Sequence, residues 1–212
     1  MPQSDIEGSI PFRWFEEAPA DGYRNDPDVR HAYTSMIDAV RRFQDAVAGS
    51  VPPPGVSHQI EAALARMVDM IAPFAVGEDR QLFNRVLEVS GRAQSFTPEI
   101  VFDHSDTDEV QARVVFRRFH LGGGGAAHGG AVSLVFDSLL GGLANSGRSR
   151  SRTVHLEIDY RHITPVDTEL TLFGRVVEEK GRKRYLTGSL MDGDTILAEA
   201  NGLFLALLPG QQ

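Results

Sequence analysis

Hydrophobic residues recur with two different periods along this chain, and the change of period divides it. Between residues 29 and 71 the spacing is three or four positions, which is typical of amphipathic helices. Asp28 is the predicted N-cap of the first helix, and Ser57 caps a second after a proline-rich break. The first apolar stripe consists of Val29, Tyr33, Met36, Val40, Phe43 and Val47, and the second of Ile60, Leu64, Met67, Val68 and Ile71. Both stripes must be buried against something.

A period of two dominates from about residue 98 onward and favours β-strands. The clearest case is residues 153–160, where Val154, Leu156, Ile158 and Tyr160 alternate with polar residues. Further strands are predicted at 100–102, 110–119, 169–177, 184–191 and 195–208. A continuously apolar segment at 132–143 interrupts this series and predicts a helix. One long helix among antiparallel strands predicts an α+β fold with the helix packed on one concave sheet face.

Composition narrows the class of protein. With 212 residues, 42% of them hydrophobic, the chain can form one full core plus an extension, which we assign as a domain at 57–212 and an N-terminal arm and helix at 1–56. Cysteine is absent, so disulfides and a cysteine nucleophile are excluded. No apolar run reaches membrane-spanning length and no signal peptide is recognisable, so we expect a cytoplasmic protein. A net charge of −8 argues against binding to nucleic acid.

Two basic clusters could nevertheless meet a small phosphorylated ligand. One consists of Arg148, Arg150 and Arg152, and the other of Lys180, Arg182, Lys183 and Arg184. Solvated turns explain either cluster equally well when it is taken alone.

The strongest chemical signal lies at His128-Gly129-Gly130, at the start of the apolar helix. The glycines there and at 122–125 let the backbone approach a ligand closely, where unpaired amides at a helix start suit an oxyanion. Asp137 follows nine positions after the histidine. A helical projection places it on a narrow stripe of small and polar residues on an otherwise apolar helix, where a charged group needs a reason.

The segment from His128 to Asp137 resembles the central helix of hotdog-fold acyl-CoA thioesterases of the phenylacetate-pathway and thioesterase-superfamily-member type. The resemblance continues through residues 153–165, the turn at 181–183 and the last strand, 198–204, and so covers roughly the last hundred residues. It implies a hotdog fold, in which an antiparallel sheet wraps around one central helix, here with an N-terminal helical extension. Residues 1–56 match nothing recognisable.

The resemblance also implies hydrolysis of an acyl-CoA thioester to a carboxylic acid and coenzyme A. Gly129 and Gly130 would donate their amides to the carbonyl oxygen, and His128 would orient the loop. Asp137 would act as general base or as nucleophile, and Thr153 would hold the water. Arg150, Arg152, Arg182, Lys183 and Arg184 would bind the phosphates of coenzyme A, and neither metal nor bound cofactor is required.

Two other functions stay open, a hotdog enoyl-CoA hydratase or dehydratase and a non-catalytic acyl-CoA-binding protein. No histidine spacing indicates a metal site, and the chain contains no Gly-x-Ser-x-Gly elbow and no Walker motif. An intact helix separates Gly130 from Asp137 by about 10 Å, too far for one thioester carbon to contact both. We therefore expect a homodimer, or a dimer of dimers, with shared active sites.

Overall fold

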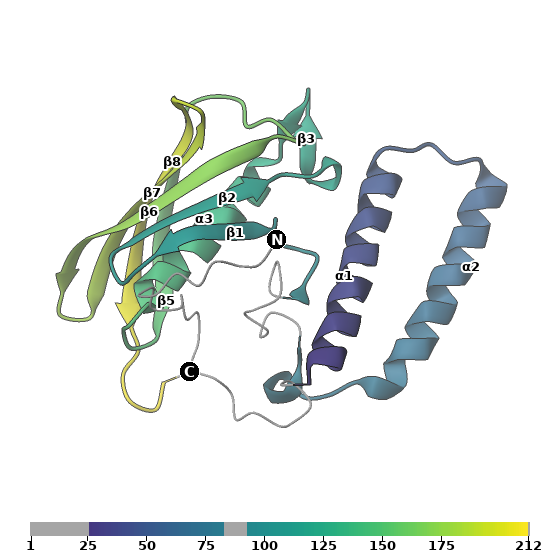
Figure 1. The fold of residues 1–212 in the computed structure, drawn as a ribbon, viewed down its shortest axis with the longest axis horizontal. Coiled ribbons are helices and arrows are strands. Elements are labelled where there is room, and N and C mark those ends of the chain that lie inside the picture. Colours follow the sequence, from purple (N-terminus) through teal and green to yellow (C-terminus); the bar gives the residue numbers. More distant parts are fainter. Residues whose placement is uncertain (1–25, 83–92, 212) are drawn as a thin grey trace. The chain divides into compact units, whose positions relative to one another are not determined.

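This computed structural model describes residues 26–82 and 93–211, which fall into two compact units (Figure 1). Residues 18–94 form a helical unit, and residues 95–212 form a unit that contains the sheet. The sequence predicted a boundary at residues 56 and 57, whereas the units divide after residue 94. Both predicted helices therefore belong to the same unit. Most of the predicted N-terminal arm lies outside the described residues.

Proline sets the start of both helices in the first unit. Helix α1 (Pro27–Ala48) has Asp26 as its N-cap, and the Asp26 side chain accepts a hydrogen bond from the Asp28 amide at 2.9 Å. Helix α2 (Pro54–Ile71) begins three residues before Ser57. The predicted caps, Asp28 and Ser57, were therefore wrong, because proline lacks the N–H that the first helical position leaves unused and fits there best.

The predicted apolar stripes are largely exposed in the single chain. In α1 only Ile37 and Arg41 are buried, and Arg41 donates from Nη2 to the Gln94 carbonyl at 2.6 Å. No residue of α2 is buried. Short 3-10 turns follow at Ala72–Phe74 and Glu78–Arg80. None of the helices in the described part of the chain is long and apolar enough to cross a membrane.

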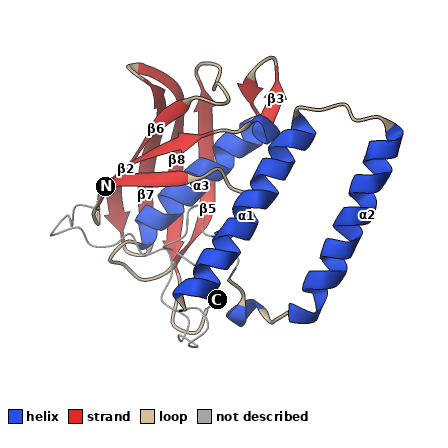
Figure 2. Cartoon of the chain, turned by 45° about the vertical axis from the view of Figure 1, so that its right-hand side comes forward, coloured by secondary structure: helices blue, strands red, loops and turns tan. Residues whose placement is uncertain are grey.

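The described residues of the second unit form a six-stranded antiparallel sheet with the order β1-β2-β6-β7-β8-β5 (Figure 2). The strands are β1 (Ile100–Ser105), β2 (Glu109–Val115), β5 (Ser151–Tyr160), β6 (Glu169–Lys180), β7 (Lys183–Asp192) and β8 (Thr195–Ala206). Between β2 and β5 lie a 3-10 turn (Arg118–His120), the small hairpin of β3 (Leu121–Gly123) and β4 (Ala126–Ala127), and helix α3 (Gly129–Asn145). The predicted α+β fold is confirmed.

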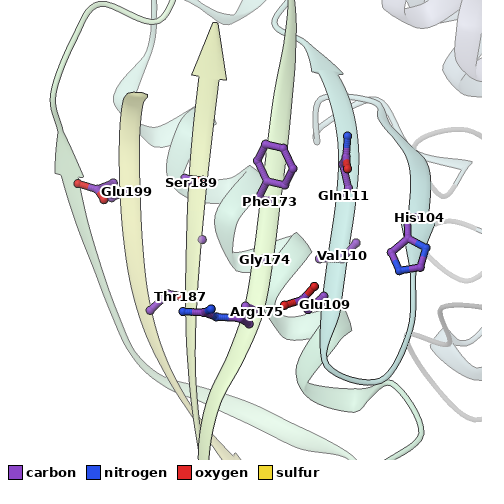
Figure 3. Close-up of a pocket in the computed structure, with 11 residues that line it drawn as sticks. His104, Glu109, Val110, Gln111, Phe173, Gly174, Arg175, Thr187, Ser189 and Glu199 are labelled. Carbon is purple, nitrogen blue, oxygen red and sulfur yellow. The ribbon is translucent and has the colours of Figure 1, made fainter. Parts of the chain in front are cut away.

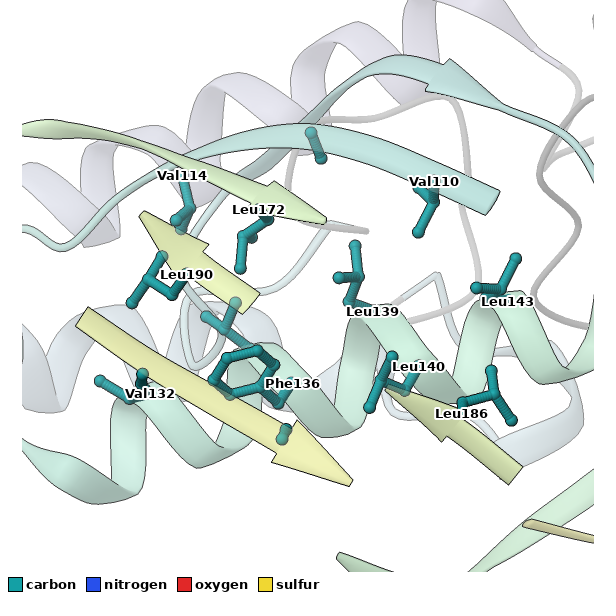
Figure 4. Packing of buried hydrophobic residues seen from close by; sticks show 14 of the residues in the cluster. Val110, Val114, Val132, Phe136, Leu139, Leu140, Leu143, Leu172, Leu186 and Leu190 are labelled. Atoms are coloured by element: carbon teal, nitrogen blue, oxygen red, sulfur yellow. The ribbon is translucent and has the colours of Figure 1, made fainter. Parts of the chain in front are cut away.

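Helix α3 packs on one face of this sheet and supplies the centre of the core (Figure 4). Its fully buried apolar side chains are Val132, Val135, Phe136, Leu139, Leu140, Leu143 and Ala144. Some of them lie against strand glycines. A Cβ atom at Gly174 would lie 2.8 Å from Val110 Cγ1 and 3.3 Å from Leu139, and one at Gly188 would lie 3.2 Å from Phe136. Glycine in neighbouring strands thus lets the helix approach the sheet closely.

We predict that Gly174→Ala destabilises the protein by about 1–3 kcal/mol, because the added methyl overpacks the contact between α3 and the sheet. Thermal or urea unfolding measures this change. Gly55→Ala is the matched control, since a Cβ at Gly55 meets nothing within 4 Å. Equal stability of the two variants would contradict the close contact.

Candidate functional site

The N-terminus of α3 is capped by a histidine side chain. His128 Nδ1 accepts a hydrogen bond from the Gly130 amide at 2.9 Å, while the His128 backbone is extended, with φ −61° and ψ 132°. This cap occupies one of the two amides that the sequence predicted as oxyanion donors. The Gly129 amide has no hydrogen-bond acceptor among the described residues. Of the Gly129 and Gly130 amides, only that of Gly129 is therefore free to donate to a ligand.

The glycine loop before α3 supports this cap. The His128 amide donates to the His120 carbonyl at 2.7 Å, and a Cβ at Gly122 would lie 2.8 Å from His128 Cα. Gly123, Gly124 and Gly125 have positive φ and make the tight turn of the β3–β4 hairpin. In this conformation, the backbone that packs closely against Gly122 is that of His128.

Asp137 and Thr153 come together across the gap between α3 and β5. Thr153 Oγ1 donates to Asp137 Oδ1 at 2.8 Å, which orients the carboxylate. Among the described residues, no other side chain or amide donates to Asp137, so Oδ2 is available to a water or a substrate. Asp137 is half-buried on the stripe that the helical projection predicted, and none of the stripe residues Gly130, Ser133, Leu134, Ser138 and Gly141 is buried.

A β-bulge makes this contact possible. Strict alternation along β5 would put Val154 on the helix side and turn Thr153 away. The register shifts between Thr153 and His155, so that Thr153 pairs with buried Phe204, and Val154 is 58% exposed. An extra residue in one strand reverses the facing of the residues before it. The predicted alternation was therefore wrong at Val154.

Sequence reasoning did not find the role of Tyr160, which it treated as an ordinary strand residue. The Tyr160 hydroxyl lies 2.9 Å from the Gly129 carbonyl oxygen and 2.9 Å from Ser133 Oγ. A usable signal was present, because a tyrosine at the end of a row of core-facing aliphatic residues brings a hydroxyl that needs a partner.

Strand β5 thus holds α3 at three places. Asn145 Oδ1 accepts from the Ser151 amide at 2.8 Å at the end of the helix. Thr153 binds Asp137 near its middle, and Tyr160 binds Gly129 at its start. One strand therefore fixes the relative positions of Gly129 and Asp137.

Arg184 lies in the interior instead of on the predicted phosphate-binding surface. It is 5% exposed and donates to the carbonyl oxygens of Ala144 at 2.6 Å and Ser149 at 2.7 Å. Burial lowers the pKa of Arg184, while the nearby Glu179 carboxylate opposes this shift. A cation is favoured beside the carbonyls at the C-terminus of a helix. Arg184 therefore has a structural function at the end of α3.

Arg148 joins the same region to the β1–β2 turn. Its guanidinium bonds to Asp108 and to Glu179, both at 2.6 Å, and to the carbonyl of Thr107. Desolvation lowers the pKa of Arg148, but the hydrogen bonds to Asp108 and Glu179 outweigh it and leave the pKa raised.

Two of the other predicted phosphate-binding residues, Arg152 and Lys183, share the opposite face of the sheet. Arg152 on β5 and Lys183 on β7 both pair with Leu205 on β8, next to buried Phe204, and so point away from α3. Arg182 donates from Nε to the Ala206 carbonyl at 3.0 Å, and the Leu207 amide donates to the Arg150 carbonyl at 2.8 Å. We call Arg152 and Lys183 the basic patch.

A separate groove of about 420 Å³ lies on the same outer face (Figure 3). Phe173, Arg175 and Ser189 line it together with His104 at its side, and charges of both signs face it. Neither Asp137 nor Gly129 contributes to its lining. The described residues contain no group of three or more His, Asp or Glu side chains that could hold a metal.

Comparison with solved structures identifies the fold. No family profile and no curated protein matches the sequence. A crystal structure of a thioesterase superfamily protein is similar with a TM-score of 0.71 and 24% identity, over 82% of this chain and 94% of that chain. The chain has the hotdog fold. Since the sheet unit makes up little more than half of the chain, the similarity also includes part of the helical unit.

Two other similar structures cover only about half of this chain. One is a protein from Streptococcus mutans bound to acetyl-CoA, with 17% identity, a TM-score of 0.49 and coverage of 51% of this chain and 88% of that chain. The other is a hypothetical thioesterase from Streptococcus pneumoniae with coenzyme A, with 18% identity, a TM-score of 0.48 and coverage of 50% and 86%.

Arg184 and Lys183 are neighbours on β7 that face opposite sides of the sheet, so substituting each in turn tests the structural role of Arg184. Arg184→Met should lower the free energy of unfolding by about 2–4 kcal/mol, because the buried carbonyls of Ala144 and Ser149 lose their charged donor. Lys183→Met, at the exposed neighbouring position, should change it by less than about 0.5 kcal/mol. Urea unfolding of both variants provides the comparison, and a small effect of both would show that Arg184 is dispensable for the fold.

Proposed function

We propose that this protein is an acyl-CoA thioesterase, which hydrolyses an acyl-CoA to a carboxylic acid and free coenzyme A. The observation that carries the proposal is that α3 holds two groups: the Asp137 carboxylate, which accepts a hydrogen bond from Thr153 on β5, and the unused Gly129 amide. A carboxylate held by one oxygen and a polarised amide are the two groups that acyl transfer to water requires. The hotdog fold, and the structural similarity to a thioesterase superfamily protein, support this reaction class.

The Gly129 amide would donate to the thioester carbonyl oxygen and stabilise the negative charge that develops there. Its peptide carbonyl, on His128, accepts hydrogen bonds from Ala131 at 2.8 Å and Val132 at 3.3 Å, which polarises the N–H further. An oxyanion donor of this kind contributes roughly 3 kcal/mol of transition-state stabilisation.

Asp137 would act at the carbonyl carbon. As a general base it takes a proton from water, the hydroxide adds to the carbonyl, and the C–S bond breaks as the tetrahedral intermediate collapses. The departing thiolate then recovers the proton from the Asp137 carboxyl group. As a nucleophile, Asp137 would instead attack the carbonyl carbon and form an acyl anhydride as the C–S bond breaks and coenzyme A leaves as the thiolate. Water then hydrolyses the anhydride to the carboxylic acid and regenerates Asp137, and the thiolate takes up the proton that water releases. The Thr153 hydrogen bond is compatible with both roles.

The complete site requires a second copy of the chain. Eight residues of helix separate Gly129 from Asp137, which is about 12 Å along the axis. Among the described residues, the ten-residue strand β5 pairs only with β8, so its other edge has no strand partner and lies beside the half-exposed stripe of α3. We infer a homodimer through this edge, with Gly129 of one subunit facing Asp137 of the other.

The basic patch would bind the phosphates of coenzyme A. Arg152 directly precedes Thr153 on β5, so the patch lies one residue along the strand from the side chain that binds Asp137, on the other face of the sheet. Guanidinium and ammonium groups are the usual partners of phosphate.

We predict that Asp137→Asn lowers kcat for acyl-CoA hydrolysis by at least about 10²-fold without loss of fold, because the amide keeps the acceptor for Thr153 but not the base or nucleophile. Thiol release from a panel of acyl-CoAs measures this, with Asp192→Asn, at the exposed end of β7, as control. Unchanged kcat in folded Asp137→Asn would refute the mechanism. If the wild type hydrates an enoyl-CoA, or binds an acyl-CoA tightly without turnover, that activity replaces the proposed function.

Reversing the charge of Arg152 and Lys183 to Glu should raise KM for an acyl-CoA by about tenfold and leave KM for the same acyl group on a short thiol unchanged. The effect should weaken with added salt, because these charges are exposed. Arg66→Glu, an exposed substitution on α2, is the control for net charge. Equal changes for both substrates would show that the patch does not bind the nucleotide.

Shared sites predict complementation between two inactive variants. Gly129→Pro removes the donor N–H and adds a ring whose Cβ would lie 3.3 Å from the Tyr160 hydroxyl. The backbone should accept proline, since His128 already has the extended conformation that precedes it and Gly129 is the first helical residue. A random mixture of Gly129→Pro and Asp137→Asn subunits should recover about a quarter of wild-type activity, with one working site per mixed dimer. Mixed dimers without activity, from folded parents, would contradict the shared site.

A further inference from the structure

Two hydroxyl groups converge on the carbonyl oxygen of Gly129. Ser133 Oγ donates to it at 3.1 Å, from one turn further along α3. The Tyr160 hydroxyl donates to it at 2.9 Å from the end of β5. The two hydroxyl oxygens are also 2.9 Å apart. Since each hydroxyl has one hydrogen, either both donate to the carbonyl, or one donates to the other, which in turn donates to the carbonyl. Besides its place as a backbone acceptor in the first turn of α3, the Gly129 carbonyl thus has side-chain hydroxyls from two different elements within hydrogen-bond distance.

This group restrains the residue that provides the unused amide. Glycine has more backbone freedom than any other residue, so the direction of the Gly129 N–H depends on how its two peptide planes are held. The plane before it is fixed through the His128 carbonyl, which accepts from Ala131 and Val132. The plane after it is fixed on the carbonyl side by Ser133 and Tyr160, and on the amide side by the His128 cap.

Tyr160 is suited to this function and poorly suited to a core role. Leu156 and Ile158, on the same row of β5, pack against the hydrophobic core, whereas Tyr160 is 53% exposed. Its hydroxyl lies so close to Gly129 that a Cβ there would be 3.3 Å from it. The tyrosine thus contributes a directed hydrogen bond and also favours glycine at position 129.

We propose that Tyr160 and Ser133 are positioning residues, which aim the Gly129 amide at the thioester carbonyl. This proposal rests on the proposed thioesterase function and deepens it. Neither hydroxyl is assigned to the reacting atoms. Both act through the Gly129 carbonyl, in the peptide that follows the one carrying the Gly129 N–H. In the shared-site arrangement, the edge strand of each subunit therefore orients the acid of one site through Thr153 and the oxyanion donor of the other site through Tyr160.

Tyr160→Phe tests the proposal at nearly constant volume. It should lower kcat about tenfold with KM changed by less than about twofold, because a misdirected donor weakens the transition state more than the bound substrate. Ser133→Ala should act in the same direction. The two losses should not multiply in the double variant, because both groups bind one oxygen. Tyr185→Phe, on the outer face of β7, is the matched control and should retain wild-type kinetics.

A second readout separates positioning from a general structural effect. A trifluoromethyl ketone analogue of the acyl-CoA binds as a tetrahedral adduct and should lose affinity for Tyr160→Phe by the same factor as kcat/KM. Inhibition by free coenzyme A and the unfolding temperature should stay unchanged. A drop in kcat accompanied by equal losses of coenzyme A binding or stability would overturn the proposal, as would wild-type kcat in Tyr160→Phe.

The amide resonances of Gly129 and Gly130 keep this test independent of turnover. Tyr160→Phe should shift both signals in an amide NMR spectrum, and Tyr185→Phe should shift neither. If the wild type hydrolyses no thioester, the proposed function fails. The restraint of Gly129 by Tyr160 then stands or falls on these spectra, and unshifted signals in Tyr160→Phe would overturn it.

Discussion

The close packing of α3 on the glycines of the sheet is the constraint on which the rest of the second unit depends. Gly174 and Gly188 leave space for Leu139, Leu140 and Phe136, so the helix can bury most of its circumference against the sheet. A helix seated this deeply has one narrow side left, and that side carries Asp137. The depth of the seat brings the first turn, with Gly129, within hydrogen-bonding reach of β5.

The edge strand β5 then fixes the helix residues of the candidate site by hydrogen bonds. Hydrogen bonds from β5 reach the start, the middle and the end of α3, and each end of the helix has its own stabilising partner. His128 caps the first turn, where amides are unpaired, and Arg184 binds carbonyls at the last turn. With both ends and the middle held, the Gly129 amide and the Asp137 carboxylate keep fixed directions. Such preorganisation is what electrostatic catalysis requires.

Basic residues close together in sequence serve different purposes because they alternate across a strand. Arg184 and Lys183 are neighbours on β7, yet one supports the helix inside the fold and the other belongs to an exposed patch. The patch joins residues from two sequence clusters, since Arg152 and Lys183 meet on either side of Leu205. Charge clusters read from a sequence mix structural and surface roles, and only strand facing separates them.

The sequence by itself determined the α+β class, the order of helix and strands, and the stripe that carries Asp137, because hydrophobic periodicity records which side of an element is buried. It did not determine the bulge that turns Thr153 toward Asp137, since one inserted residue reverses facing without changing composition. Tyr160 and Arg184 acquire their partners, Gly129 and Ala144, from segments 31 and 40 residues away. Local patterns describe an element's burial, whereas contacts between distant segments depend on how the elements pack, and the tertiary structure alone decides them.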